Sequence, residues 1–291
     1  MTYEIAQQQI QSLNSDGDYV GALKVLNSIS VEHITNPLYY FHYGFALHES
    51  HRENEAVEYF KRAKEMGLEE VDEFPNTFYP KSIVKWIERA EKNAPRRLEK
   101  NAFEAERRAN RAFSVKDIDY DMFDFEGFWY DSEFSRESFW GDAATDDDIT
   151  RCETALGYRL PESYKQLIKR HNGGILNRGH FENPLQRSWE PETFAIESIH
   201  GVDKAKEYSL CGESGTRFWI SEWGYPNIGV VIGEDKYAHA HCLFFLDYSD
   251  CGPDGEPCVV YINQERNYEI TYLADNFALF IQGLYSEDED F

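Results

Sequence analysis

Three residues in the C-terminal half could bind a metal ion. His239 and His241 are one residue apart, and Cys242 follows directly. On a β-strand the two histidines would face the same side, as zinc ligands can, whereas Cys242 would point the other way. The spacing of the next cysteines, Cys251 and Cys258, matches no common zinc motif. The pattern therefore favours two unliganded histidines at a strand edge, with a metal-dependent hydrolase as a minor alternative.

Other catalytic patterns are weak or absent. The segment 211–215 contains a cysteine, a glutamate and a serine, but the sequence assigns no base that would activate a nucleophile. Gly-rich phosphate loops, H-E-x-x-H and G-x-S-x-G do not occur. Paired carboxylates carry little information in a chain with 53 acidic residues. We therefore expect a protein that is not an enzyme and has no cofactor and no catalytic residue.

The charge balance restricts the partners. Asp and Glu number 53 against 29 Lys and Arg in 291 residues, a net charge of −24. Such a charge disfavours nucleic acids and anionic membranes and suits a basic protein. The 42% of hydrophobic residues exclude a disordered polyanion.

The location is predicted from what the sequence lacks. No apolar run approaches a membrane span, and the start resembles no signal peptide. Five cysteines, an odd number in a long chain, are typical of reduced thiols in a cytoplasmic protein. The oligomeric state does not follow from the sequence.

Charge also divides the chain. Residues 1–115 carry 18 acids and 15 bases, whereas residues 116–291 carry 35 acids and 14 bases. A change this abrupt predicts a domain boundary near residue 115. The basic stretch between Arg96 and Arg111 is expected to be a solvated face that docks on the acidic domain rather than a site for a separate anion.

The first domain repeats at 34 residues. Equivalent apolar positions recur between segments 3–36 and 37–70, and the second copy resembles a tetratricopeptide repeat. Gly44 and Ala56 would let the two helices of one hairpin approach closely. With a further helix pair at about 78–93 and 96–113, we expect an all-α stack of three hairpins. Such a stack either binds a segment of another protein or serves only as a platform.

The second domain is predicted to be α+β. A helix should run from the acidic residues 146–148 to about Leu156 and end at Gly157, and Pro161 should open the next helix. A final helix should place Leu273 and Phe277 on one face. Together with the strands this predicts a mainly antiparallel sheet covered by helices. The predicted strands are 218–220, 228–232, 243–246 and 259–262, the last two joined as a hairpin by the turn at 250–257.

The segments 160–167 and 171–174 resemble the signature of the SUKH superfamily, which includes fungal cell-wall regulators and bacterial immunity proteins. The likeness extends over roughly 120–286. It implies a non-catalytic domain that binds a protein, often a nuclease toxin. It also implies a structural role for the motif residues: Leu160, Pro161, Tyr164, Asn172, Gly173 and Gly174.

The sequence therefore predicts an immunity protein that occludes a basic, possibly nuclease, toxin. The runner-up is an adaptor or regulatory scaffold that joins two protein partners. Acidic and aromatic residues alternate at 123–131 and 219–225, where partner anchors and buried core residues are both possible. The residues expected to contact the partner lie near strand ends and turns: Glu222, Trp223, Asp247, Tyr248 and Asp250.

Overall fold

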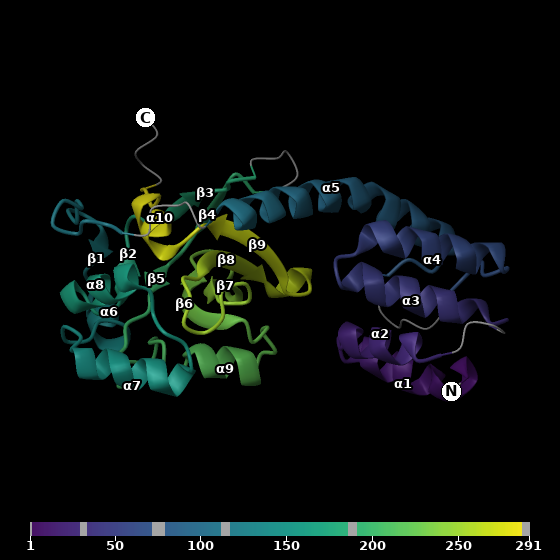
Figure 1. Ribbon diagram of the computed structural model, residues 1–291, viewed down its shortest axis with the longest axis horizontal. Helices are drawn as coiled ribbons and strands as arrows, with labels where there is room; N and C mark the ends of the chain where they lie inside the picture. The colour runs from purple at the N-terminus through teal and green to yellow at the C-terminus, as the bar shows by residue number, and fades with distance from the viewer. Residues whose placement is uncertain (1, 30–33, 72–78, 112–116, 186–190, 287–291) are drawn as a thin grey trace. The chain divides into compact units, whose positions relative to one another are not determined.

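The computed structural model describes residues 2–29, 34–71, 79–111, 117–185 and 191–286. The chain divides into two compact units, Met1–Ala105 and Glu106–Phe291 (Figure 1). The boundary predicted at residue 115 lies outside the described residues. None of the helices in the described part of the chain has both the length and the hydropathy that a membrane crossing needs.

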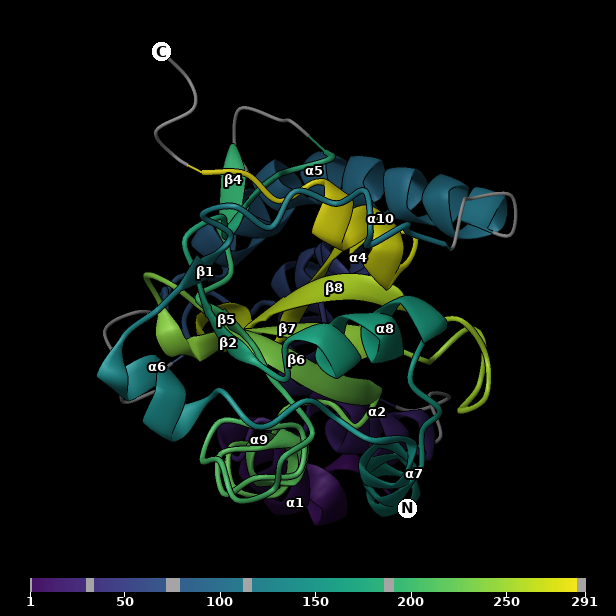
Figure 2. The same ribbon diagram turned by 90° about the vertical axis from the view of Figure 1, so that its left-hand side faces the viewer.

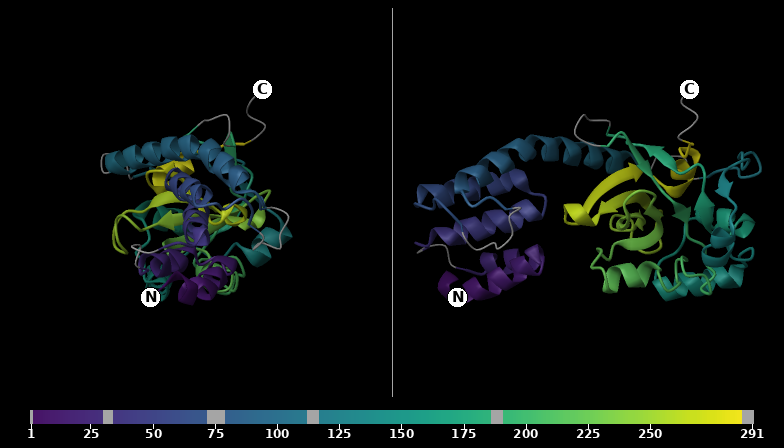
Figure 3. Two further views of the ribbon diagram at one scale, coloured as in Figure 1. Left: turned by 90° about the vertical axis from the view of Figure 1, so that its right-hand side faces the viewer. Right: turned by 180° about the vertical axis from the view of Figure 1, so that it is seen from behind.

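The first unit is built from helices with the predicted period. The first and third helices begin 34 residues apart, as do the second and fourth. Asp18 and Asn36 cap two of them by accepting hydrogen bonds from the backbone N–H groups of Gly21 and Leu38. The helices lie side by side (Figures 1 and 3): α1 Tyr3–Ser15, α2 Tyr19–Asn27, α3 Pro37–Glu49 and α4 Glu53–Glu65. Their assignment as tetratricopeptide repeats stays a prediction.

Aromatic rings fill the core of this unit. The Trp86 ring lies 5.6 to 5.7 Å from the rings of Phe41, Phe45 and Phe60. Gly44 faces Phe60, and a Cβ atom at Gly44 would lie 2.8 Å from the Phe60 ring and 3.3 Å from the carbonyl oxygen of Ala56. The close approach of α3 and α4 therefore depends on the absence of a side chain at residue 44.

The predicted pair of helices at 78–93 and 96–113 is wrong. A single helix, α5, runs from Ile83 to Asn110 with Pro95 inside it, and the division between the two units falls within this helix. Proline removes one backbone donor from the helical ladder. The residues on both sides are mostly good helix formers, and they carry the helix through this position.

The second unit confirms the α+β class, with antiparallel strand pairs in all three sheets. Its largest sheet has the order β6-β7-β8-β9, with strands Gly229–Asp235, His239–Asp247, Cys258–Asn263 and Glu269–Ala274. The smaller sheets contain β1 Trp129–Tyr130, β2 Gly174–Leu176 and β5 Ser198–Ile199, and β3 His180–Glu182 with β4 Thr193–Ala195. The helices are α6 Glu133–Ser138, α7 Asp146–Leu156, α8 Glu162–Arg170, α9 Thr216–Ser221, the 3-10 helix Gln264–Arg266 and α10 Phe277–Gln282.

Both faces of the largest sheet are buried. Val230 and Phe244 face a core that also contains Tyr164 of α8 and Phe280 of α10. Their neighbours along the strands belong to a second core under α9, which includes Trp219, Val231 and Phe245. Because side chains alternate along a strand, burial of both faces requires the continuous apolar runs that mark β6, β7 and β8. Figure 2 shows α8 in front of these strands.

Several local predictions are confirmed. Helix α7 begins with a capping box between Thr145 and Asp148 and ends at Gly157, whose φ is +79°. Strands β6, β7 and β8 contain the predicted apolar runs, and β7 and β8 form the predicted hairpin. The match between capping chemistry and helix ends explains why these boundaries were predictable.

Two local predictions are wrong. Residues 218–220 belong to the helix α9 and not to a strand, because Thr216 and Trp219, three residues apart, are the buried positions there. Leu273 lies in β9 rather than in the last helix, which begins after Asn276 accepts a hydrogen bond from the N–H of Leu279 at 3.0 Å. Short apolar runs do not distinguish a strand from one helical turn.

Gly44→Ala is expected to lower the free energy of unfolding of the first unit by about 1–2 kcal/mol, because the new methyl group overlaps the Phe60 ring. The loss should occur although alanine favours a helix over glycine by about 1 kcal/mol. Urea denaturation of the full chain followed by circular dichroism measures it, and hydrogen exchange in α3 assigns it to this unit.

The control is the same change in a Phe60→Leu background, where the ring that the methyl group meets is gone. Gly44→Ala should cost less there than in the natural chain. Equal costs in the two backgrounds would show that the contact between Gly44 and Phe60 does not limit the packing.

Candidate partner-binding surface

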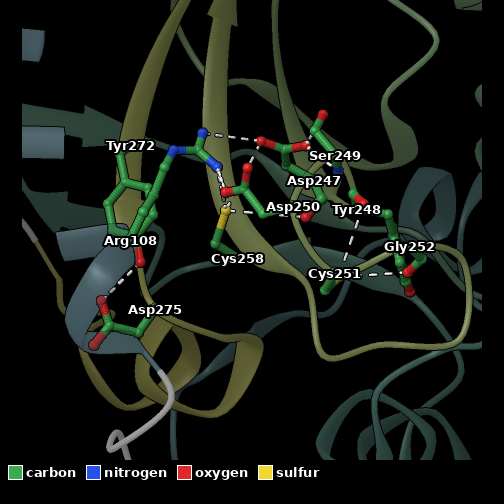
Figure 4. Close-up of polar contacts among 10 residues, drawn as sticks. All are labelled: Arg108, Asp247, Tyr248, Ser249, Asp250, Cys251, Gly252, Cys258, Tyr272 and Asp275. Carbon is green, nitrogen blue, oxygen red and sulfur yellow. Dashed lines mark hydrogen bonds and ion pairs between the residues drawn. The ribbon is translucent and has the colours of Figure 1, made fainter. Parts of the chain in front are cut away.

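Asp247, one of the predicted contact residues, is the last residue of β7 and is only 2% exposed. Its carboxylate accepts a hydrogen bond from Arg108 at 3.1 Å, and from the backbone N–H and the hydroxyl of Ser249 at 2.9 and 2.6 Å (Figure 4). The guanidinium of Arg108 lies 5.4 Å from the centre of the Tyr272 ring. Asp247 therefore binds the end of α5 to the sheet inside the second unit.

Charge and burial set the ionisation of this cluster. Burial opposes the charge on Arg108, but its carboxylate partners Asp250 and Asp247 raise its pKa above the ordinary value. Burial, and then the charge of Asp247, raise the pKa of the Cys258 thiol to about 12, so this thiol is protonated at neutral pH. A charged arginine thus lies next to the buried carboxylate of Asp247, and this pairing offsets the cost of removing the carboxylate from water.

Asp250 lies in the turn after β7 and is exposed. Its carboxylate also accepts a hydrogen bond from Arg108 (Figure 4). Arg107, the neighbouring arginine, pairs with Asp275 at 2.9 Å. The basic stretch therefore pairs with acidic residues at Arg107 and Arg108.

Tyr248 is buried. Its hydroxyl donates a hydrogen bond to the carbonyl oxygen of Arg159 at 2.6 Å, and its ring lies 4.7 Å from that of Tyr158. Burial raises the pKa of its phenol above the ordinary value. Tyr248 thus holds the segment after α7 against the sheet and offers little surface to a partner.

The other two predicted contact residues follow α9. Glu222 is exposed, whereas Trp223 is half-buried, with its ring 5.4 Å from Trp219 and 6.2 Å from His241. His241 lies near the start of β7 and Asp247 at its end, six residues or about 20 Å apart along the strand. The structure therefore does not bring the five predicted residues together in one patch.

Asn172, in the signature, joins three chain segments. Its side-chain amide N–H donates to the carbonyl oxygen of Asp142 at 2.7 Å, and its amide oxygen accepts from the N–H of Val202 at 2.8 Å. Its own carbonyl oxygen accepts from the N–H of Gly141 at 2.9 Å. Buried polar groups need such partners, and this residue supplies them to two loops at once.

The turn after Asn172 admits only glycine without strain. Gly173 has a φ of +85°, and a Cβ atom there would lie 2.6 Å from the backbone nitrogen of Gly201 and 2.7 Å from the carbonyl oxygen of Phe139. Gly174 begins β2 beside His171, whose ring stacks between Trp129 and Trp140 at 4.0 and 4.1 Å. The chain therefore turns in close contact with three other segments, at Phe139, Gly201 and Trp129.

The remaining signature residues position α8. Pro161 occupies the N-cap position of the helix, and the N–H of Leu160 donates to the carboxylate of Glu153 at 2.8 Å. Tyr164 is fully buried and donates from its hydroxyl to the carbonyl oxygen of His200 at 2.5 Å. These contacts fit the structural role that the family resemblance implies.

His200 is fully buried, and in the described part of the chain no hydrogen-bond partner is found for either ring nitrogen. Burial lowers the pKa of its imidazole to about 3. The ring is therefore neutral in the native domain near neutral pH and also well below it.

The aromatic residues of the segment 123–134 lie partly in the core and partly on the surface. Phe128 is fully buried, and Trp129 packs against the same core. Tyr130 in β1 and Phe134 in α6, by contrast, are 51% and 53% exposed. We call their neighbourhood the β1–α6 surface: Tyr130, Asp131, Glu133, Phe134 and Glu137, all exposed.

The sequence indicated only part of the β1–α6 surface. Its pattern of acids and aromatics includes Tyr130, but nothing in the pattern separates this residue from the buried Phe128. Phe128 precedes the two-residue edge strand β1 and is buried, whereas within β1 Trp129 packs against the core and Tyr130 faces outward. Phe134, three residues after Asp131, lay beyond the stretch that the sequence singled out.

The structure offers little support for a metal site. In the ranges that it describes, no three His, Cys, Asp or Glu side chains lie close enough together to hold an ion. Nδ1 of His241 lies 3.2 Å from the amide oxygen of Gln264, and Cys242 is buried in the core. The side chain of His239 lies outside the described part of the chain. A cavity of about 290 Å³ beside β9 is lined by apolar residues, by Glu182 and Asn183, and by the ion pair of Arg107 and Asp275.

Residues 143–283 match the SMI1 / KNR4 family (SUKH-1). The match begins just before α7 and ends just after α10, and it includes the whole four-stranded sheet. It confirms the resemblance in the C-terminal half over a shorter range than the sequence suggested. No curated protein matches the chain.

Gly173→Ala is expected to lower the free energy of unfolding of the second unit by about 3 kcal/mol, because a left-handed φ and two backbone clashes act together. Gly252→Ala is the matched control, because Gly252 has a similar φ of +72° with no atom within 4 Å of the added Cβ. The control should lose only about 1 kcal/mol. Urea denaturation monitored by tryptophan fluorescence compares the two, and similar losses would contradict the role of the turn.

His200→Leu is expected to flatten the acid side of the stability profile. The folded pKa lies near 3 and the unfolded value near 6.5, so only the unfolded chain gains this proton as the pH falls from 6.5. Native stability should therefore fall by up to about 1.4 kcal/mol per pH unit through this residue, a loss that the variant lacks.

The measurement is urea denaturation at pH 7 and at pH 4.5. Between the two, the natural chain should lose roughly 2.5 kcal/mol more than His200→Leu. His241→Leu, which alters an exposed histidine, should behave like the natural chain. Parallel profiles for the natural chain and His200→Leu would show that His200 is not buried as a neutral ring.

Proposed function

Since residues 143–283 of this chain belong to the SMI1 / KNR4 family (SUKH-1), we propose that the chain is a non-catalytic immunity protein that binds a basic protein toxin and covers its active surface. The family includes toxin-immunity proteins and cell-wall regulators. In both roles the domain acts by binding other proteins. The proposal needs no cofactor and places the protein in the cytoplasm, where the toxin would act.

The observation that carries the proposal is the β1–α6 surface. Tyr130 and Phe134 expose about half of each side chain, although large aromatic residues are usually buried. Asp131, Glu133 and Glu137, which neighbour them in the sequence, are also exposed, and Arg136 pairs with Asp131. Exposed aromatic anchors ringed by charge are typical of protein interfaces.

Electrostatics favours a basic partner. A nuclease must present a cationic groove to hold the phosphates of its substrate. The acidic half of the chain, with 35 acids and 14 bases, would be attracted to that groove and place carboxylates where phosphates bind. The exposed aromatic residues would then supply most of the affinity.

The predicted contact residues enter this proposal in two ways. Glu222, Trp223 and Asp250 expose all or part of their side chains and are proposed as additional contacts. Asp247 and Tyr248 are buried and act by holding the turn that carries Asp250. A partner would contact the three exposed residues directly. The two buried residues would affect binding only by fixing the conformation of the turn.

An adaptor or regulatory scaffold is the second candidate. The observation that favours it is the separate helical unit, which has its own aromatic core around Trp86. A unit of this kind can bind a peptide independently of the acidic domain. In that case residues 1–105 would recruit one protein and the acidic domain another.

The test is survival of bacteria that express a panel of cationic nuclease toxin domains together with this chain. We expect protection against at least one toxin, and loss of protection in the Tyr130→Ala/Phe134→Ala double variant. At 1 kcal/mol or more for each anchor, affinity should fall at least about 30-fold, which pull-down titration measures.

Tyr237→Ala is the matched control, because Tyr237 is another exposed aromatic residue, 61% exposed, outside the β1–α6 surface. It should protect as well as the natural chain. Full protection by the double variant would exclude the β1–α6 surface as the interface. Failure against every toxin, combined with stable capture of a protein by residues 1–105, would favour the adaptor.

A further inference from the structure

Two cysteines far apart in sequence meet in the second unit. The sulfur atoms of Cys152 and Cys211 are 3.0 Å apart, and the two residues are not joined by a disulfide. Cys152 lies on α7 and is 3% exposed, whereas Cys211 lies in the loop before α9 and is partly exposed. One thiol is thus accessible to a small oxidant, with a second thiol directly behind it.

The surroundings shift the pKa values of the two thiols in opposite directions. The hydrogen bond from Cys152 lowers the pKa of Cys211, and the positive charge of Arg217 lowers it further, against the effect of burial. The same hydrogen bond, followed by burial, raises the pKa of Cys152. Arg217 is held beside the pair because its guanidinium donates to the carbonyl oxygen of Ala155 at the end of α7. Cys211 is therefore the better nucleophile.

We propose that Cys152 and Cys211 form an oxidation site at which a peroxide closes a reversible intramolecular disulfide. The Cys211 thiolate attacks one peroxide oxygen, the O–O bond breaks, and the departing hydroxide takes a proton to become water. The Cys211 sulfenic acid then reacts with Cys152. The S–S bond forms, the S–O bond breaks, and the proton of the Cys152 thiol leaves with the hydroxide as a second water.

The electron balance is complete with hydrogen peroxide as the oxidant. Two thiols and one peroxide give one disulfide and two waters, so two electrons pass from sulfur to oxygen. The two sulfurs need to move about 1 Å closer to reach the length of a disulfide bond. The disulfide would tie α7 to the loop at 200–215, in which the N–H of Leu210 already donates to the carbonyl oxygen of Gly201.

Cys251 provides a matched control. It is also partly exposed, but its sulfur lies near backbone oxygens, 3.9 Å from that of Tyr248 and 3.4 Å from that of Gly252. Burial raises the pKa of its thiol. It thus shares the partial exposure of Cys211, and among the described residues the hydrogen bonds of its sulfur include no second thiol that would resolve a sulfenic acid.

The experiment treats the folded full chain with equimolar hydrogen peroxide, blocks the remaining thiols with N-ethylmaleimide and maps the peptides by mass spectrometry. We expect a peptide pair that links residue 152 to residue 211, two fewer maleimide additions, and full reversal by dithiothreitol. The oxidised protein should melt at a higher temperature than the reduced one. Cys251→Ser should form the link as efficiently as the natural chain.

Cys152→Ser gives a second measurement that does not depend on the disulfide. Without the resolving thiol, Cys211 should stop at the sulfenic acid and be labelled by dimedone at least tenfold more than Cys251. The proposal is overturned if peroxide leaves both thiols free in the folded chain. Equal dimedone labelling of Cys211 and Cys251 would also overturn it.

Discussion

The turn at residues 172–174 constrains the whole acidic domain. Asn172 donates to one loop and accepts from another, while Gly173 lets the backbone of the same two loops approach to a distance that no side chain permits. The turn joins α8 to β2. It therefore fixes the helix that covers the largest sheet relative to β2, the strand that pairs with β1. The exposed edge at Tyr130 and Phe134 is placed by this arrangement.

Acidic residues serve two distinct purposes in this domain. Asp247 is buried and bonded to Arg108 and Ser249, and its removal would take away the buried one of the two carboxylates that pair with Arg108. The acids of the β1–α6 surface, by contrast, are exposed, and in water their charge contributes little to stability. Their excess is better explained by attraction to a cationic partner, which acts over a longer range than any contact.

Much of the fold could be predicted from local chemistry. The capping box at Thr145, the left-handed Gly157 and the apolar runs of β6, β7 and β8 each have one favourable structure. The helix at 216–221 and the strand β9 could not be predicted, because short apolar segments fit either structure until their tertiary neighbours are known. The same limit applies to the interface: sequence marks Asp247 and Tyr248 as a polar turn, but only packing shows that both are buried.

The most direct test of the account is a titration of toxin activity with this chain at concentrations far above the dissociation constant. If the domain acts by covering a cationic surface, inhibition should increase linearly and end at one chain per toxin. Added salt should weaken the complex, because exposed charges are screened. Complete inactivation of the toxin by a small fraction of an equivalent would mean that the chain turns over, and would contradict the proposal that it acts by binding alone.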